Sequence, residues 1–238
     1  MNKDLVYTLT DKYIDKTVQV IYQSINSPVE LLNKVCTHLI ANGGKRVRPR
    51  LMILTAGLIG GEKHIDNDEL INMSAMTEIL HTSTLMHDDV IDMSEKRRGV
   101  DSTNIAFSNT LAVLGGDYLF TKIFLAINKI KDINQRIKIT EVFSGTLSDL
   151  VEGEIEQLQN ISDKKLSEEK YFKVIHSKTS VLFEICTIVP GVLADLSDEK
   201  IKALKIFANC LGNAFQITDD ILDYTASIDE MGKMLEMI

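Results

Sequence analysis

Two segments of this 238-residue chain carry the same arrangement of three aspartates, D-D-x-x-D, inside apolar sequence. The first cluster consists of Asp88, Asp89 and Asp92, and the second of Asp219, Asp220 and Asp223. On a helix, positions i, i+1 and i+4 lie within a sector of about 100°, so each cluster is expected to crowd three carboxylates onto one face. Such crowding beside apolar residues requires a cation, and hard carboxylate oxygens suit Mg²⁺, which substrate phosphates usually help to coordinate. The spacing therefore predicts Mg²⁺ at both clusters.

Other interpretations of the aspartates explain less. A single cluster is equally consistent with a polar helix face paired with lysines, but two copies in apolar helices favour a metal site. Zinc is disfavoured because His81 and His87 are six residues apart and no cysteine lies nearby. The spacing of an EF-hand calcium loop is also absent.

Two basic segments accompany the aspartates in a chain whose formal net charge is −8. Residues 43–50 read GGKRVRPR, and residues 96–99, which follow the first cluster, read KRRG. Arginine and lysine side chains beside flexible glycines suit a diphosphate. Either basic run alone would be read as solvated loop charge. Cations next to a predicted metal site indicate a polyphosphate ligand.

The elements that must position these residues are predicted to be helices. Apolar residues recur at spacings of three, four and seven, and no stretch alternates like a strand between hairpin turns. Breaks are expected at 26–28, 43–44, 60–61, 99, 129–134, 161–167 and 195–198. They leave roughly eight helices with short loops. Since no low-complexity linker interrupts them, we expect one all-α domain over residues 1–238.

Composition excludes several classes of protein. The acidic balance repels polyanions, so nucleic acid is not an expected partner. The three cysteines, Cys36, Cys186 and Cys210, are widely spaced among apolar residues, which predicts buried, reduced thiols in the cytoplasm. The first residues lack the pattern of a signal peptide. The apolar run at 181–194 is shorter than the roughly 18 residues of a membrane helix, so no membrane span is expected.

The motifs occur in the order typical of trans-isoprenyl diphosphate synthases, and the chain resembles this polyprenyl synthetase family over nearly its whole length. The resemblance rests on GGKRVRP (43–49), HDDVID (87–92), KRRG (96–99), GEIEQ (153–157), SKT (177–179) and FQITDDILDY (215–224). The segments HTSTL (81–85), GGDYL (115–119) and the stretch from EKY (169–171) to LFE (182–184) are most similar to long-chain members such as octaprenyl diphosphate synthases.

The resemblance implies a helical bundle around a central cavity, a homodimer, and condensation of isopentenyl diphosphate with an allylic diphosphate such as farnesyl diphosphate. Isopentenyl diphosphate would be held by Lys45, Arg48, His81 and Arg98. The allylic diphosphate would be held by Arg97, Lys178, Thr179, Gln216 and Lys233. Mg²⁺ would be held by Asp88, Asp92 and Asp219, with Asp89, Asp220 and Asp223 in support, and Gln157 would lie near the metal. The residues expected to act in catalysis are Asp88, Asp92, Lys178 and Asp219.

The residues one turn before the first aspartates are predicted to set the product length. Thr84 and Ser83 lie four and five positions before Asp88, so both should face the tunnel for the growing chain. In the family a bulky aromatic there stops elongation early. The small side chains therefore predict a long all-trans product of about eight isoprene units (C40), of the kind used for quinone side chains.

The family pattern continues beyond Gly232-Lys233, whereas this sequence ends at Ile238, so we expect the domain to lack its C-terminal helices. The main alternative is a truncated non-catalytic or regulatory subunit of a polyprenyl synthase. A terpene cyclase would share the fold and the first aspartate cluster, but not GGKRVRP (43–49) or the second aspartate cluster. A phosphohydrolase using His87 and Asp88 would leave both basic segments unexplained.

Overall fold

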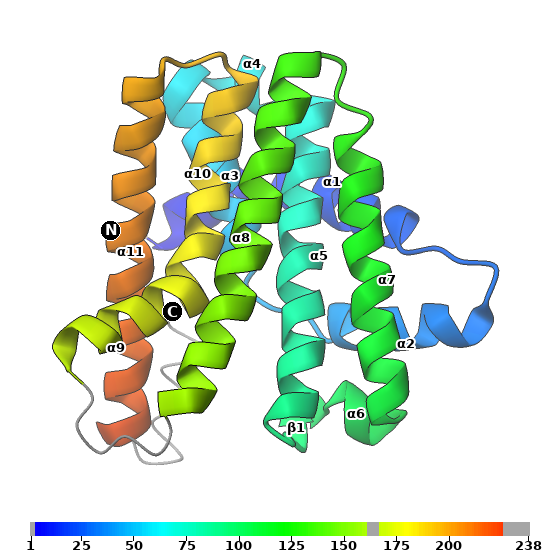
Figure 1. Cartoon of the computed structure of the whole chain (residues 1–238). Helices are drawn as coiled ribbons and strands as arrows, with labels where there is room; N and C mark the ends of the chain where they lie inside the picture. Colours follow the sequence, from blue (N-terminus) through cyan, green and yellow to red (C-terminus); the bar gives the residue numbers. More distant parts are fainter. Residues whose placement is uncertain (1–2, 161–166, 226–238) are drawn as a thin grey trace.

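The computed structural model describes residues 3–160 and 167–225, and within them the chain is an all-α bundle, as predicted (Figure 1). The longer helices are α1 (Lys3–Ser24), α2 (Glu30–Ala41), α3 (Val47–Gly60), α5 (Asp68–Ile91), α7 (Asn109–Ile127), α8 (Ile133–Asn160), α9 (Glu168–Ile175), α10 (Val181–Leu193) and α11 (Asp198–Thr225). The shorter elements are α4 (Glu62–Ile65), α6 (Thr103–Ala106), a π-helical turn (His176–Ser180) and a hairpin of β1 (Lys96–Arg97) and β2 (Val100–Asp101).

The long helices begin and end close to the predicted breaks. Helix α3 ends at the Gly60-Gly61 pair, where Gly61 has a positive φ of 67° that favours glycine. The hydroxyl of Ser167 accepts a hydrogen bond from the amide of Lys170 at 3.3 Å and so caps α9 as expected. The sequence did not predict α4, α6 or the π-helical turn.

Helix α5 forms the centre of the bundle and carries the first aspartate cluster in its last turns. Its side chains Met73, Met76, Ile79 and Leu80 are fully buried, and α1, α3, α7 and α10 pack around it. Figure 1 shows α5 between α7 and α8, with α10 and α11 on the other side of α8. Polar residues such as Ser74, Thr77 and Thr82 are buried on α5 together with its apolar ones, so this helix is enclosed by its neighbours over most of its length.

Helices α5 and α11 both descend to the lower end of the bundle in Figure 1, where α8, the hairpin and α9 also lie. The two aspartate clusters stand near the C-terminal ends of these two helices. The fold therefore brings both clusters to the same end, although more than a hundred residues separate them in the sequence.

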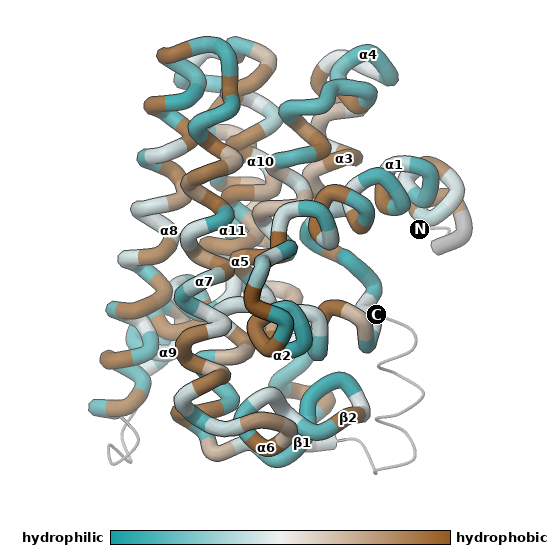
Figure 2. Tube along the Cα trace, turned by 90° about the vertical axis from the view of Figure 1, so that its right-hand side faces the viewer, coloured by the Kyte–Doolittle hydropathy of each residue, from teal (hydrophilic) through white to brown (hydrophobic). Residues whose placement is uncertain are grey.

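Helix α7 is longer than the apolar run at 181–194 on which the expectation of no membrane span rested. It is the one helix in the described ranges that is long and apolar enough to cross a membrane, a test that core helices of soluble proteins also pass. One side of α7 packs against α5 and α2, and the other exposes Val113, Leu114, Phe124 and Leu125. The apolar stretches of this and neighbouring helices are drawn in brown in Figure 2.

Cys210, predicted to be buried, is exposed on α11, whereas Cys36 and Cys186 are buried.

Candidate active site

A cavity of about 220 Å³ at the lower end of the bundle collects one of the predicted groups of ligands. The basic loop at 44–48, helix α5, the hairpin and α11 all contribute to its wall. It is lined by Gly44, Lys45, Arg46, Val47, Arg48, Glu78, His81, Arg98, Phe215 and Asp219. The four residues expected to bind isopentenyl diphosphate thus meet in one place, which we call the basic cavity.

Two residues of the basic cavity have buried polar atoms without a partner in the protein. The guanidinium of Arg48 lies 5.4 Å from the ring centre of Phe183, and its Nε atom is unpaired. Burial lowers the pKa of Arg48. Burial, reinforced by the charges of Arg48 and Arg98, lowers the pKa of His81 well below its usual value, and its Nδ1 atom is also unpaired. Since buried polar atoms rarely stay unpaired, this site suits an oxygen-rich anionic ligand beside a neutral imidazole.

The first aspartate cluster is arranged differently from the prediction that all three carboxylates share one face. Asp89 is fully buried, and its Oδ1 atom lies 2.6 Å from Nη2 and 2.8 Å from Nε of Arg97. The hairpin returns Arg97 to the helix, which turns this carboxylate into an ion-pair partner. Asp92, by contrast, is exposed at the end of α5.

Asp88 is the carboxylate of this cluster that lacks an adequate positive partner. Its pKa is raised to about 6, chiefly by burial and also by Glu154 and Asp92, and the charges of Lys178 and Arg97 offset this rise only in part. A carboxylate that is costly to ionise in the empty protein gains most from a bound cation. This property makes Asp88 the best candidate metal ligand of the first cluster.

An apolar groove of about 250 Å³ begins at Asp88 and Lys178. It continues along α5, α7 and α8, and its other lining residues are Thr84, His87, Ile91, Phe120, Leu147, Leu150, Val151, Glu154, Ile155 and Leu158. Thr84 lines it as predicted. The expectation for Ser83 was wrong, because this residue is fully buried and its hydroxyl donates to the carbonyl of Gly116 at 2.8 Å.

Lys178 and Thr179 stand on the π-helical turn between α9 and α10. A Cβ atom on Gly153 of α8 would lie 2.3 Å from Cβ of Ser177, and one on Gly212 of α11 would lie 2.6 Å from Cα of Ser180. The turn therefore fits between two helices only because both positions are glycine. Single π-helical turns are frequent at functional sites.

Side-chain hydrogen bonds connect the π-helical turn to its neighbours. Lys178 Nζ donates to Gln157 Oε1 at 3.3 Å, which places Gln157 close to the first cluster, as the resemblance implied. The hydroxyl of Thr179 donates to Gln216 Oε1 of α11. Three of the residues expected to bind the allylic diphosphate, Lys178, Thr179 and Gln216, thus lie together, whereas Lys233 lies outside the described residues.

The second aspartate cluster also divides into different roles. Asp219 lines the basic cavity, and burial, then Asp223 and Asp220, raise its pKa. Asp220 accepts hydrogen bonds from the hydroxyl of Tyr171 at 2.6 Å and from Nε2 of Gln216 at 2.9 Å. The first of these bonds raises the pKa of Tyr171 to about 12. Asp223 is exposed.

The carboxylates suit a Mg²⁺ ion whose coordination is completed by a substrate, because they do not form a closed cage by themselves. Within residues 3–160 and 167–225, no group of three or more histidine, cysteine or acidic side chains is close enough to hold a metal alone. Mg²⁺ is commonly held by one or two carboxylates together with substrate phosphates. The raised pKa values of Asp88 and Asp219 mark carboxylates without sufficient protein cations. Asp88 with Asp92, and Asp219 with Asp223, are the candidate donors.

Four residues near these sites were not assigned a role from the sequence: Arg46, Glu78, Glu154 and Tyr171. Glu78 precedes His81 by three positions, so helical spacing could have placed both on one face. Tyr171 is 49 positions from Asp220, and nothing in the sequence signals their contact.

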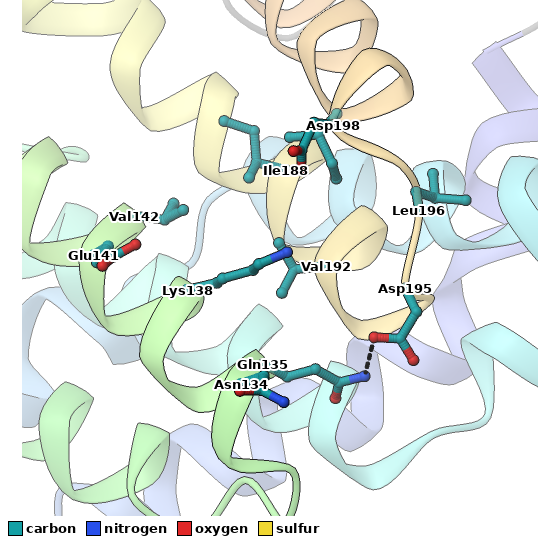
Figure 3. Close-up of a pocket in the computed structure, with 11 residues that line it drawn as sticks. Asn134, Gln135, Lys138, Glu141, Val142, Ile188, Val192, Asp195, Leu196 and Asp198 are labelled. Carbon is teal, nitrogen blue, oxygen red and sulfur yellow. Dashed lines mark hydrogen bonds between the residues drawn. The ribbon is translucent and has the colours of Figure 1, made fainter.

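A larger cavity, of about 750 Å³, lies at the opposite end of the bundle (Figure 3). It is bounded by the start of α8 and by the connection between α10 and α11, where Gln135 Nε2 donates to Asp195 Oδ1 at 3.0 Å. It contains none of the predicted site residues. Size alone would therefore have pointed to the wrong end of the protein.

Comparison with known proteins places the chain among enzymes of prenyl chain synthesis. It is 37% identical over 233 residues to the octaprenyl diphosphate synthase of Escherichia coli strain K12, covering 98% of this chain and 70% of the relative. It is 40% identical over 215 residues to an all-trans-nonaprenyl-diphosphate synthase (geranyl-diphosphate specific) of Rhodobacter capsulatus. This match covers 90% of this chain and 64% of the relative.

Solved structures agree with these relatives. A polyprenyl synthase from Caulobacter crescentus, complexed with calcium and isoprenyl diphosphate, superimposes with a TM-score of 0.87 at 33% identity, over 96% of this chain and 67% of that one. A decaprenyl diphosphate synthase from Rhodobacter capsulatus gives a TM-score of 0.86 at 32% identity, over 93% of this chain and 66% of that one. The chain thus spans about two thirds of the length of such relatives.

The family model described as Polyprenyl synthetase matches residues 29–236, which include both aspartate clusters and both basic segments. The chain belongs to the polyprenyl synthetase family of prenyltransferases.

Proposed function

We propose that this chain is a Mg²⁺-dependent prenyltransferase that condenses isopentenyl diphosphate head-to-tail with an allylic diphosphate. The observation that carries the proposal is that the basic cavity and the head of the apolar groove adjoin at two consecutive residues, Arg98 and Arg97. Arg98 lines the basic cavity, while Arg97 pairs with Asp89 beside the head of the apolar groove. A diphosphate in each site would bring the two reacting carbon chains together, which supplies much of the rate of a bimolecular reaction.

The basic cavity is the proposed site of isopentenyl diphosphate. Lys45, Arg48 and Arg98 supply positive charge for the diphosphate oxygens. His81 enters this site as a neutral imidazole that can share a hydrogen bond with the ligand without adding charge. These residues would bind and orient the nucleophilic double bond, and no protein nucleophile is required.

The allylic diphosphate is proposed to bind at the head of the apolar groove. Lys178 lines this position, and Thr179, Gln216 and Arg97 would join it in stabilising the departing diphosphate. Asp88, Asp92, Asp219 and Asp223 would hold Mg²⁺, which when bound neutralises the leaving diphosphate. The apolar side chains of the groove would keep water away from the allylic carbon.

The growing prenyl chain is proposed to extend along the groove beyond Thr84. Because Thr84 is small and the chain is similar to octaprenyl diphosphate synthases, we assign a product of about C40, suited to a quinone side chain.

We further propose that the protein acts in the cytoplasm as a homodimer. The outward face of α7 exposes Val113, Leu114, Phe124 and Leu125, and an apolar stripe of this kind suits a second copy of the chain. Sedimentation of the purified protein tests this assignment, and a monomer at micromolar concentration would contradict it.

The decisive experiment incubates the purified chain with MgCl₂, radiolabelled isopentenyl diphosphate and farnesyl diphosphate, and then sizes the extracted products. Products in the C40 range support both the enzyme class and the length assignment. Shorter prenyl products support the class alone. A folded chain that binds isopentenyl diphosphate but forms no product would instead favour a non-catalytic subunit of a polyprenyl synthase.

A further inference from the structure

A buried carboxylate lies in the wall of a cavity otherwise suited to anions. The side chain of Glu78, on α5, is only 4% exposed, yet it faces the same cavity as Lys45, Arg48 and Arg98. A negative charge in this position repels a diphosphate, and burying it without a partner would be costly. Its presence therefore requires a specific role.

Glu78 pairs with arginines from two segments that are far apart in the sequence. Its Oε1 atom lies 2.5 Å from Nη1 of Arg46, which precedes α3, and 3.4 Å from Nη2 of Arg98, which belongs to the hairpin connection. Arg46 also donates to the carbonyl of Ile40. Arg98 donates to the carbonyls of Leu39 and Gly43.

The backbone around both arginines is held in a costly conformation. Arg46 and Arg98 have positive φ angles of 52° and 53°, in the left-handed region that favours glycine. Such a conformation persists only when surrounding contacts enforce it. A Cβ atom on Gly44 would lie 3.4 Å from Cζ of Arg98, so the loop packs closely on this guanidinium. Glu78 is the carboxylate common to both arginines.

The two arginines differ in their exposure to the cavity. Arg46 is buried and bonds to Glu78 and to the carbonyl of Ile40, so it ties the basic loop to α5. Arg98 is more exposed and lies in the cavity wall beside His81. Fixing a guanidinium before the ligand arrives reduces the entropy lost on binding.

We propose that Glu78 is a positioning residue that, through Arg46 and Arg98, holds the basic loop and the hairpin connection in the geometry that binds the diphosphate of isopentenyl diphosphate. This inference rests on the proposed function for the identity of the ligand. The positioning itself can be tested without any ligand.

The first measurement is amide hydrogen exchange of the purified chain and of Glu78→Gln. Because one carboxylate joins both segments, residues 42–46 and 96–100 should exchange faster together in the variant, while α8 keeps its wild-type rates. Glu184→Gln is the matched control, since Glu184 is a buried, ion-paired carboxylate on α10 outside the cavity. Unchanged exchange of both segments in Glu78→Gln would overturn the inference.

The second measurement is calorimetric titration with isopentenyl diphosphate, and separately with farnesyl diphosphate in MgCl₂. We expect Glu78→Gln to weaken isopentenyl diphosphate binding by about tenfold or more, as for loss of one partner of a buried charge pair, while farnesyl diphosphate affinity stays within about twofold. Equal weakening of both ligands would indicate general damage and overturn the inference. A wild-type chain that binds no isopentenyl diphosphate would contradict the proposed function, and hydrogen exchange would still decide the positioning.

The double variant Glu78→Gln/Arg46→Met separates positioning from stability. Removing both members of the buried pair should restore thermal stability relative to Glu78→Gln, because the buried guanidinium of Arg46 is no longer left without its carboxylate. Arg98 still lacks its carboxylate, so isopentenyl diphosphate binding should remain weak. Recovery of wild-type affinity in the double variant would contradict the inference.

Discussion

The hydroxyl of Tyr171 donates to Oδ2 of Asp220 at 2.6 Å and so links α9 to the second aspartate cluster. Gln216 binds the other oxygen of Asp220, and Thr179 binds Gln216. These bonds form a continuous chain from α9 through α11 to the π-helical turn. Asp220 therefore connects the predicted metal site to the predicted allylic site within one network.

Replacing Tyr171 with Phe removes this hydroxyl and little else. We expect the MgCl₂ concentration for half-maximal prenyl transfer to rise, and the rate at saturating substrate to fall, by about tenfold, since a hydrogen bond to a charged group contributes about 1.5–3 kcal/mol. Tyr118→Phe is the control, because that hydroxyl donates at 3.1 Å to the carbonyl of Asn26, away from the site. Equal rates for Tyr171→Phe and wild type would show that the network has no role in activity.

The burial of Asp88 predicts a stability gain when its charge is removed. Its pKa rises from 3.8 to about 6 on folding, so the folded state binds a proton more tightly than the unfolded state. Asp88 therefore destabilises the metal-free protein above pH 6, by on the order of 1–3 kcal/mol, and this cost disappears as the pH falls below 4. Asp88→Asn should raise the unfolding temperature in EDTA at pH 7.5 but not at pH 3.5.

The same residue is expected to be essential for activity, so stability and turnover should move in opposite directions. Asp88→Ala should abolish turnover while the helix content measured by circular dichroism stays unchanged. An Asp88→Asn protein that is less stable than wild type at pH 7.5 would contradict the raised pKa, and wild-type turnover would contradict the metal assignment.

Much of the fold follows from local sequence. Helix α3 ends at Gly60-Gly61 and α9 begins after Ser167, because a positive φ angle and a capping hydroxyl depend on only one or two residues. The placement of both aspartate clusters at the same end of the bundle was also predictable, because the repeated motif and the basic segments indicate a common ligand.

The individual roles of the aspartates were not predictable, because long-range contacts determine them. Helical spacing places Asp89 within about 100° of Asp88 on the helix, but it does not reveal that the hairpin brings Arg97 back onto Asp89. For the same reason the spacing suggested that Ser83 and Thr84 both face the groove, although the carbonyl of Gly116 accepts the hydroxyl of Ser83.

The difference between these two neighbours gives a test of product length. Thr84→Phe should place a ring in the groove beside His87 and Phe120 and shorten the main product by at least one isoprene unit. Ser83→Ala should leave product length unchanged and lower the free energy of unfolding by about 1 kcal/mol, because a buried hydrogen bond is lost. Chromatography of the labelled products distinguishes the two variants. Unchanged product length in Thr84→Phe would mean that the prenyl chain follows another path.

Two glycines of α8 provide a matched test of the π-helical turn. In Gly153→Ala the new methyl group would lie 2.3 Å from Cβ of Ser177, so the turn carrying Lys178 must move. Nothing lies within 4 Å of the corresponding position at Gly145, which is exposed on the same helix.

Gly145→Ala should therefore raise the free energy of unfolding by about 0.5–1 kcal/mol through helix propensity and leave prenyl transfer unchanged. Gly153→Ala should lower the rate by about tenfold or more, since an error of about 1 Å in a positioned group can cost more than this. Initial rates and thermal unfolding measured on both proteins decide the matter. If Gly153→Ala keeps the wild-type rate, the position of Lys178 does not depend on how the π-helical turn packs against α8.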